Sequence, residues 1–142
     1  MFGELILGEK LAVSGDYLFV YGTLRSDAGN DMSQLLAGNA DFVDYAVFQG
    51  RLYRVDYYPG AVPSDDPEDR IPGEIYRLQD TVCLWPCLDS YEGCGPEFPE
   101  PNEYLRQRRK VRLGNGKSIS AWIYLYNRPI DGLELIECAD RS

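Results

Sequence analysis

The chain has 142 residues and a net charge of −9 at pH 7, from 14 Lys and Arg against 23 Asp and Glu. This length is typical of one domain with its own core, and the negative charge opposes binding to nucleic acid or to anionic lipid surfaces. The chain contains no His, so a Ser-His-Asp or Cys-His pair has no general base and zinc lacks its usual imidazole ligands. We expect neither a metal nor a cofactor.

The sequence also indicates a compartment. No apolar stretch approaches the roughly 20 residues of a membrane span, and charged residues interrupt the apolar ones over residues 1–14. We therefore expect a soluble, cytoplasmic protein without a cleaved signal and without membrane contact. The four Cys include no CxxC pair, and in a domain of this size they favour reduced, buried, structural thiols over a disulfide frame or metal site.

The first clear element is a run of aromatic and aliphatic residues from Tyr17 to Tyr21, which predicts a strand buried on both faces. Gly22 and Thr23 then break the run. Glycine tolerates positive φ and close approach to the main chain, so the backbone N–H groups of Gly22, Thr23 and Leu24 could point at an anionic or carbonyl oxygen. An ordinary glycine turn is the simpler alternative.

The next stretch predicts a short helix and a long strand. Asp31 is a candidate N-cap for one or two helical turns over residues 31–36. Residues 40–55 are rich in aromatic and β-branched side chains and predict a strand, in which Gly50 suggests a bulge or a sharp bend.

Residues 57–60 are typical of a turn, in which Pro59 presets φ and Gly60 takes a left-handed conformation. Residues 63–70 form a charged, solvated loop whose carboxylates do not have the ligand spacing of a calcium loop. Residues 71–78 predict another strand.

One helical pattern follows Asp80 and Thr81, which are capping residues. The apolar residues after them fall on one side of a helix. Pro86 interrupts the pattern, so the helix should be short, kinked, or begin later with Pro86 in its first turn. Residues 89–102 then form a loop that is too long to be only a connection, and long loops in compact domains are often functional.

Two strands, 103–113 and 117–126, flank an Asn-Gly pair that strongly predicts a hairpin. The first strand carries five basic residues, which either face water or attract an acidic ligand, and the negative overall charge favours the solvent face. The chain divides into an extension (1–16), one domain (17–130) and a tail (131–142) that looks loosely attached.

Taken together, several short blocks resemble the gamma-glutamylcyclotransferase-like family, and most closely its gamma-glutamylamine cyclotransferase and AIG2-like branches. The blocks follow the family's order over about residues 17–127. They are Leu18-Phe-Val-Tyr-Gly-Thr-Leu-Arg25, Gly50-Arg-Leu-Tyr53, Tyr58-Pro-Gly-Ala61, Pro72-Gly-Glu-Ile-Tyr76, Leu88-Asp-Ser-Tyr-Glu-Gly-Cys94 and Glu103-Tyr-Leu-Arg106.

The resemblance implies an α+β, mostly β fold: a small mixed or antiparallel β-barrel with a few short helices. It also implies an enzyme that acts on a small gamma-glutamyl amide. In that chemistry the substrate's own α-amine attacks its γ-carbonyl, so that 5-oxoproline forms and an amine or amino acid leaves. The absence of His is then no obstacle, because no outside nucleophile is needed.

The resemblance also assigns residues. Glu92 matches the family's catalytic acid/base, since one carboxylate within reach of both nitrogens can move a proton between them. Gly22, Thr23 and Leu24 match the loop whose main-chain N–H groups hold the substrate. Tyr21 precedes that loop, and Tyr104 matches an aromatic residue that closes the pocket or donates a hydrogen bond.

Two other interpretations stay open. The same pocket could hold a small acyl amide without reacting, which would make the chain a binding or regulatory module. Alternatively, the basic strand could bind acidic partners. The acidic residues of the 97–102 segment and the residues before 17 depart from the family's simplest pattern and leave the substrate open.

Overall fold

The structure is a computed structural model that describes residues 16–21, 38–55, 58–79 and 81–136. The expected extension before residue 16, the short helix over 31–36 and the three loop residues Gly22, Thr23 and Leu24 lie outside these ranges. Within them, the elements are β1 (Tyr17–Val20), β2 (Ala40–Arg54), β3 (Pro59–Pro63), β4 (Arg70–Leu78), α3 (Thr81–Tyr91), β5 (Tyr104–Leu113), β6 (Ser118–Tyr126) and β7 (Glu134–Ile136).

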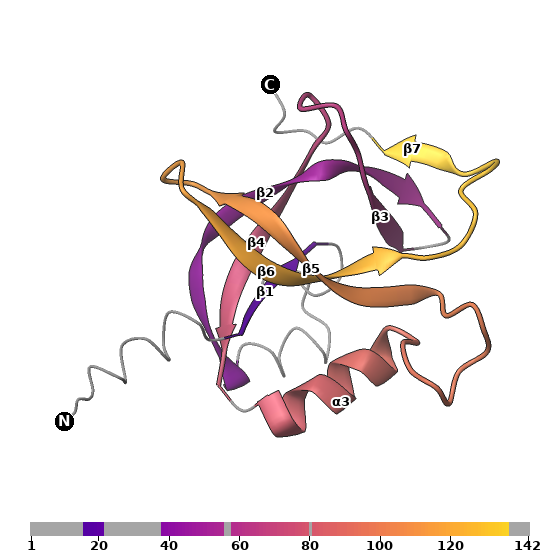
Figure 1. The fold of residues 1–142 in the computed structure, drawn as a ribbon, viewed down its shortest axis with the longest axis horizontal. Helices are drawn as coiled ribbons and strands as arrows, with labels where there is room; N and C mark the ends of the chain where they lie inside the picture. Colours follow the sequence, from indigo (N-terminus) through magenta and orange to yellow (C-terminus); the bar gives the residue numbers. More distant parts are fainter. Residues whose placement is uncertain (1–15, 22–37, 56–57, 80, 137–142) are drawn as a thin grey trace.

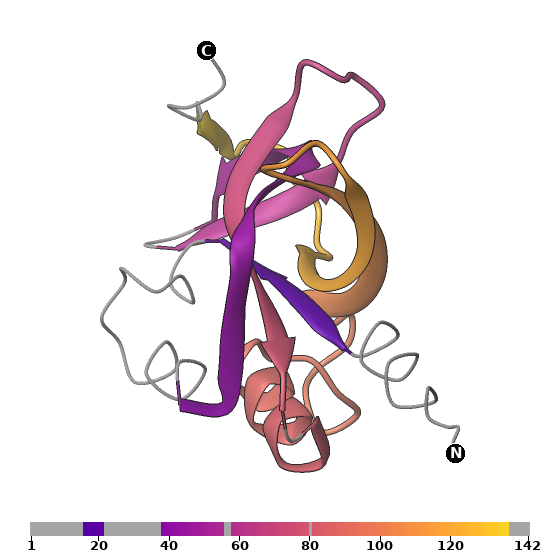
Figure 2. The same ribbon diagram turned by 90° about the vertical axis from the view of Figure 1, so that its left-hand side faces the viewer.

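Five strands close into a barrel in the order β2-β4-β1-β6-β5, and the ring is completed where β5 pairs again with β2. The pair of β1 with β6 is parallel, and the other pairs of the ring are antiparallel. The helix α3 lies against one end of the barrel (Figures 1 and 2). The predicted mixed, mostly β barrel is therefore confirmed.

The apolar residues form two clusters, one on each side of β1. Phe19 points into the barrel, where it packs with side chains such as Ile75 and Ile123. Its neighbours Leu18 and Val20 point outward and pack against the helix α3. Because successive side chains of a strand alternate between its faces, a short strand buried on both sides serves both clusters, as the Tyr17 to Tyr21 run predicted.

The long strand β2 has a bulge, but not at Gly50, where the sequence suggested one. Its register against β4 shifts between Phe42 and Asp44, and no shift occurs at Gly50. At Gly50 the strand instead changes partner from β4 to β3. A Cβ atom at this position would lie 2.5 Å from the Val62 carbonyl oxygen, so glycine is required there by the close approach of β3.

The predicted turn at Pro59 and Gly60 is wrong, because both residues belong to strand β3. Gly60 does not have a positive φ. A Cβ atom here would lie 2.8 Å from the Cβ of Tyr126, so the glycine lets β3 pack closely against the end of β6. The local sequence indicated a turn, but a contact between distant segments requires the glycine instead.

The hairpin of β5 and β6 is confirmed. The N–H of Leu113 donates to the Lys117 carbonyl at 2.7 Å, and Gly116 has a φ of 91°. The tail prediction is wrong for its first part, since β7 pairs with residues 52–54 of β2. The division of the chain into three parts stays a prediction.

The helix α3 contains Pro86 in its sixth position, so the later start that Pro86 suggested is wrong. Leu84 and Leu88 are buried against the barrel. Of the thiols on and after this helix, that of Cys87 is exposed and that of Cys94 is partly buried, and both are free. The expectation of buried thiols is therefore wrong for Cys87. No helix in the described part of the chain is long and apolar enough to cross a membrane.

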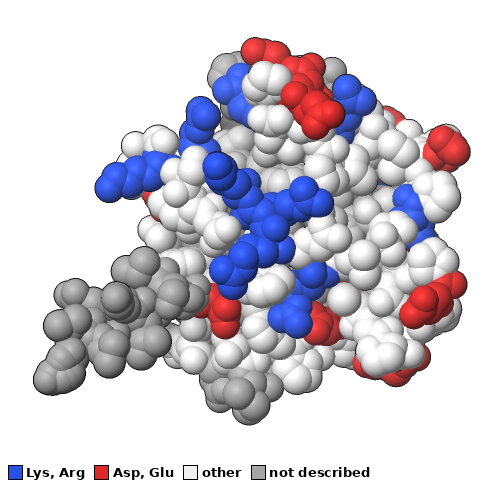
Figure 3. Space-filling view, in the orientation of Figure 1, with Lys and Arg blue, Asp and Glu red and all other residues white. Residues whose placement is uncertain are grey.

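The basic strand β5 serves two purposes. Figure 3 shows Lys and Arg side chains gathered over the face of the molecule that β5 and β6 form. Most of the five are exposed, as predicted. Arg106 differs, because its guanidinium lies 4.0 Å from the ring centroid of Trp85 and 3.3 Å from the Asp89 carboxylate, both on α3. Arg106 therefore ties the helix to the barrel.

Candidate active site

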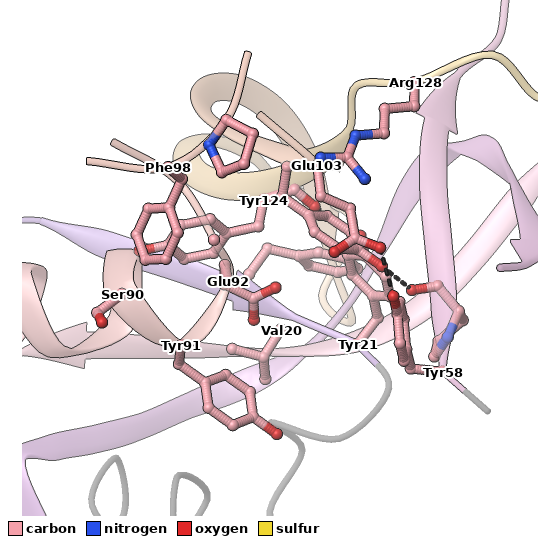
Figure 4. Close-up of a pocket in the computed structure, with 15 residues that line it drawn as sticks. Val20, Tyr21, Tyr58, Ser90, Tyr91, Glu92, Phe98, Glu103, Tyr124 and Arg128 are labelled. Carbon is pink, nitrogen blue, oxygen red and sulfur yellow. Dashed lines mark hydrogen bonds between the residues drawn. The ribbon is translucent and has the colours of Figure 1, made fainter. Parts of the chain in front are cut away.

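A cavity of about 510 Å³ lies where the end of β1, the turn after α3 and the start of β5 meet. Figure 4 shows its lining side chains, with the Glu92 carboxylate at the centre. The lining includes Tyr21, Tyr58, Glu92, Glu103, Tyr104 and Arg128. The structure thus brings Glu92, Tyr21 and Tyr104, which are far apart in the sequence, to one hollow.

Glu92 is positioned by the end of the helix α3. Its N–H still donates to the Leu88 carbonyl, as in a helix, and the chain then reverses at Gly93, which has a φ of 69°. The N–H of Gly93 donates to Ser90 and that of Cys94 to Asp89, which is the bond pattern of a Schellman motif. Because glycine adopts this left-handed conformation without strain, Gly93 fixes the direction in which Glu92 leaves the helix.

The pKa of Glu92 is raised from its ordinary value of 4.5 to about 8, mainly by burial and to a smaller extent by the nearby carboxylates of Glu103 and Asp89. Among the residues that the structure describes, none donates a hydrogen bond to the Glu92 side chain, so none of them offsets the cost of its charge in this way. A carboxyl group that is partly protonated near neutral pH can both accept and donate a proton.

The hydroxyl groups of Tyr21 and Tyr104 are occupied by main-chain partners. Tyr21 donates to the Tyr124 carbonyl at 2.5 Å and accepts from the Ala61 N–H at 3.1 Å. Tyr104 donates to the Pro59 carbonyl at 2.6 Å. Burial raises the pKa of both hydroxyl groups, so they remain neutral. The hydrogen bond expected of Tyr104 thus goes to the wall of the cavity, and its ring packs beside Tyr58.

The proposed main-chain cradle of Gly22, Thr23 and Leu24 lies outside the described residues. The preceding residues Val20 and Tyr21 both line the cavity. The chain therefore leaves β1 at the cavity wall.

Asp89 links the end of α3, which carries Glu92, to the barrel. It accepts a hydrogen bond from the Tyr124 hydroxyl at 2.6 Å and forms an ion pair with Arg106. Both partners belong to the β5-β6 hairpin, so these contacts hold the last turn of α3, and with it Glu92, against the barrel. Burial and the hydrogen bond to Asp89 raise the pKa of Tyr124, which keeps this donor protonated.

Sequence reasoning missed several lining residues. Glu103 and Arg128 both line the cavity. Glu103 also accepts a hydrogen bond from the Tyr58 hydroxyl. From the 97–102 segment, Phe98 and Pro99 contribute to the wall, whereas its two glutamates do not line the cavity. Glu103 lies in a family-like block, which is a weak signal, and the predicted hairpin already places residue 128 near residue 103, at the open end of its two strands.

Comparison with known proteins agrees with this architecture. The chain is 36% identical over 123 residues to the gamma-glutamylcyclotransferase family protein YtfP of Escherichia coli K12, which covers 87% of this chain and 93% of the relative. It is 29% identical over 112 residues to a putative gamma-glutamylcyclotransferase of Methanocaldococcus jannaschii, covering 78% and 84% of the two chains.

Solved structures show the same fold. An AIG2-like protein from Mus musculus matches 89% of this chain and 88% of its own, with a TM-score of 0.67 and 23% identity. YkqA from Bacillus subtilis matches 80% of this chain with a TM-score of 0.60 and 30% identity, and this chain spans 36% of its length.

The family model described as "Gamma-glutamyl cyclotransferase, AIG2-like" matches residues 18–140. This range includes the barrel, the helix α3 and the turn that carries Glu92. The chain therefore belongs to the gamma-glutamyl cyclotransferase, AIG2-like family, which confirms the suspected resemblance and the cyclotransferase-like enzyme type that it implied.

Proposed function

We propose that the protein converts a small gamma-glutamyl amide into 5-oxoproline and a free amine or amino acid, with Glu92 as the general acid/base. The observation that carries this proposal is the position of one carboxyl group, with a pKa raised to about 8, in the wall of a cavity of about 510 Å³. The family supplies the type of reaction, and the cavity supplies a place for it.

The first step is a proton transfer. The substrate's α-ammonium group must lose a proton before its nitrogen can attack, and the ionised form of Glu92 accepts that proton. With a pKa of about 8, roughly a tenth of Glu92 is ionised at pH 7. A carboxylate with an ordinary pKa would be a much weaker base, so the environment of Glu92 suits the task.

The amine nitrogen then attacks the γ-carbonyl carbon, and a tetrahedral intermediate forms. Glu92 donates its proton to the leaving nitrogen, the bond between this nitrogen and the γ-carbon breaks, and a five-membered lactam remains. The ring nitrogen returns its second proton to the carboxylate, which passes it to the product amine or to water. Of the three ammonium hydrogens, one stays on the ring and two leave, and no water is consumed.

Charge on the tetrahedral oxygen requires preorganised donors. We assign this task to the main-chain N–H groups of Gly22, Thr23 and Leu24, because the chain enters this loop directly from Val20 and Tyr21 in the cavity wall. The Tyr21 and Tyr104 hydroxyls already donate to main-chain carbonyls, so in this proposal they hold the wall in place and their rings face the substrate.

The test is a panel of gamma-glutamyl amines and gamma-glutamyl amino acids, incubated with the protein and assayed for 5-oxoproline by liquid chromatography and mass spectrometry. We expect release of 5-oxoproline together with an equal amount of the leaving amine. If the panel compounds raise the melting temperature but yield no 5-oxoproline over hours, the protein is a binding module and the catalytic proposal is rejected.

A further inference from the structure

Arg128 is a feature of the cavity that the reaction above does not use. It follows β6 in the chain, it is exposed, and it lines the same cavity as Glu92 and Glu103. Figure 4 shows its side chain extending from the chain beyond β6 toward the side of the cavity where Glu103 lies. Among the described lining residues it is the only one with a positive charge, whereas two carry carboxyl groups.

The Arg128 side chain is held by a neutral partner. Its Nε donates to the Pro101 carbonyl at 3.2 Å. The preceding residue, Asn127, donates through its main-chain N–H to the Glu103 carbonyl at 2.8 Å and through its side chain to the Asn102 carbonyl at 3.0 Å. The two bonds of Asn127 fix the main chain next to Arg128, and the bond to Pro101 fixes Nε of the Arg128 guanidinium.

No carboxylate of the described residues forms an ion pair with Arg128, although Glu103 lines the same cavity. Glu103 instead accepts a hydrogen bond from Tyr58. The terminal nitrogens of Arg128 therefore keep donors for a ligand. A guanidinium with two free N–H donors side by side matches the two oxygens of a carboxylate.

A carboxylate near this acidic wall needs a cation. The chain carries a net charge of −9, and Glu103 lines the cavity. A gamma-glutamyl amine is neutral overall, because its α-ammonium and α-carboxylate cancel. A gamma-glutamyl amino acid has a second carboxylate on the leaving half and a net charge of −1, so its binding depends more strongly on a local positive charge.

The position of Arg128 at the rim of the cavity indicates that it contacts the leaving half of the substrate and not the half that forms the ring. The half that forms the ring must place its α-amine at the partly buried Glu92. The leaving half must exit toward solvent, past the exposed residues of the rim, and Arg128 is one of these.

We propose that Arg128 binds a carboxylate on the leaving half of the substrate, so that the protein prefers gamma-glutamyl amino acids to gamma-glutamyl amines without that carboxylate. This inference rests on the proposed function. In this proposal Arg128 determines the substrate specificity, and Glu92 alone transfers the proton.

The test uses two substrates that differ by one carboxylate, gamma-glutamyl-alanine and gamma-glutamyl-ethylamine. For Arg128→Gln we expect KM for gamma-glutamyl-alanine to rise about tenfold, with kcat little changed, since one charge-assisted contact is lost. For gamma-glutamyl-ethylamine we expect a change of less than about twofold. Arg128→Lys should restore part of the preference. Arg109→Gln, on the exposed side of β5, is the matched control and should leave both substrates unaffected.

An equal loss of kcat/KM for both substrates would overturn the inference, because Arg128 would then bind the half that both substrates share, or stabilise the fold. Thermal melts of the variants distinguish these two cases. Unchanged kinetics with both substrates would overturn it as well. If the parent protein releases no 5-oxoproline from these two compounds or from any other compound of the panel, the proposed function fails. Calorimetric binding of the same two compounds to the parent and to Arg128→Gln then tests the inference by itself: selective loss of gamma-glutamyl-alanine binding supports it, and equal binding rejects it.

Discussion

Replacing Glu92 by Gln should stabilise the folded protein, and the gain should grow as the pH rises. The folded protein raises the pKa of Glu92 from 4.5 to about 8, mainly because the carboxylate loses contact with water. Between these two values the folded protein binds more protons at this site than the unfolded chain does. Raising the pH through this window therefore destabilises the folded protein.

The magnitude follows from the two pKa values. The cost at Glu92 is close to zero below pH 4.5, about 3 kcal/mol at pH 7, and levels off near 5 kcal/mol, as an order of magnitude, above pH 8. These figures are upper limits, because Glu92 keeps some contact with solvent. Gln has nearly the same shape and no charge, so Glu92→Gln should escape this cost at every pH.

Urea denaturation of both proteins at several pH values between 5 and 9 measures the effect. We expect the free energy of unfolding of Glu92→Gln to exceed that of the parent by an amount that increases with pH and levels off above pH 8. Glu68→Gln, at an exposed position of the 63–70 loop, is the matched control and should change the free energy by less than about 0.5 kcal/mol. A difference between Glu92→Gln and the parent that is small and independent of pH would refute the reasoning about burial.

Two other predictions concern activity and packing. Because Glu92 must be ionised to accept the first proton, kcat/KM should rise about tenfold per pH unit below pH 8 and then level off, and a profile that is flat from pH 6 to 9 would contradict this role. Gly73→Ala should destabilise the barrel by about 1–3 kcal/mol in urea denaturation, because its Cβ would lie 2.5 Å from the ring of Phe19. At Gly38 a Cβ has no neighbour within 4 Å among the described residues, so Gly38→Ala is the control, and equal effects of the two substitutions would contradict the packing argument.

The elements that the sequence predicted correctly have strong local signals. The apolar run of β1 and the Asn-Gly pair between β5 and β6 can each be recognised from a few neighbouring residues. The strand β3 was missed because Pro59 and Gly60 are typical turn residues. Gly60 is instead required by Tyr126, which comes 66 residues later and which no local pattern reveals.

The candidate site was predictable only in part, for a related reason. Glu92 is one of 23 acidic residues, and only the family resemblance distinguished it from the others. Glu103 and Arg128 lie on either side of the β5-β6 hairpin, and the pairing of Tyr104 with Tyr126 brings their neighbourhoods together. The β5-β6 hairpin therefore brings Glu103 and Arg128 together, whereas Glu92 joins them only because α3 packs against the barrel, a contact that no local pattern encodes.

The central claim is that Glu92 transfers the proton in a reaction that the substrate performs on itself. The most direct measurement compares 5-oxoproline release by the parent and by Glu92→Gln, with binding of the same gamma-glutamyl compound measured for both by calorimetry. We predict that Glu92→Gln binds the compound and releases no measurable 5-oxoproline. Release at the parent's rate by Glu92→Gln would contradict the account.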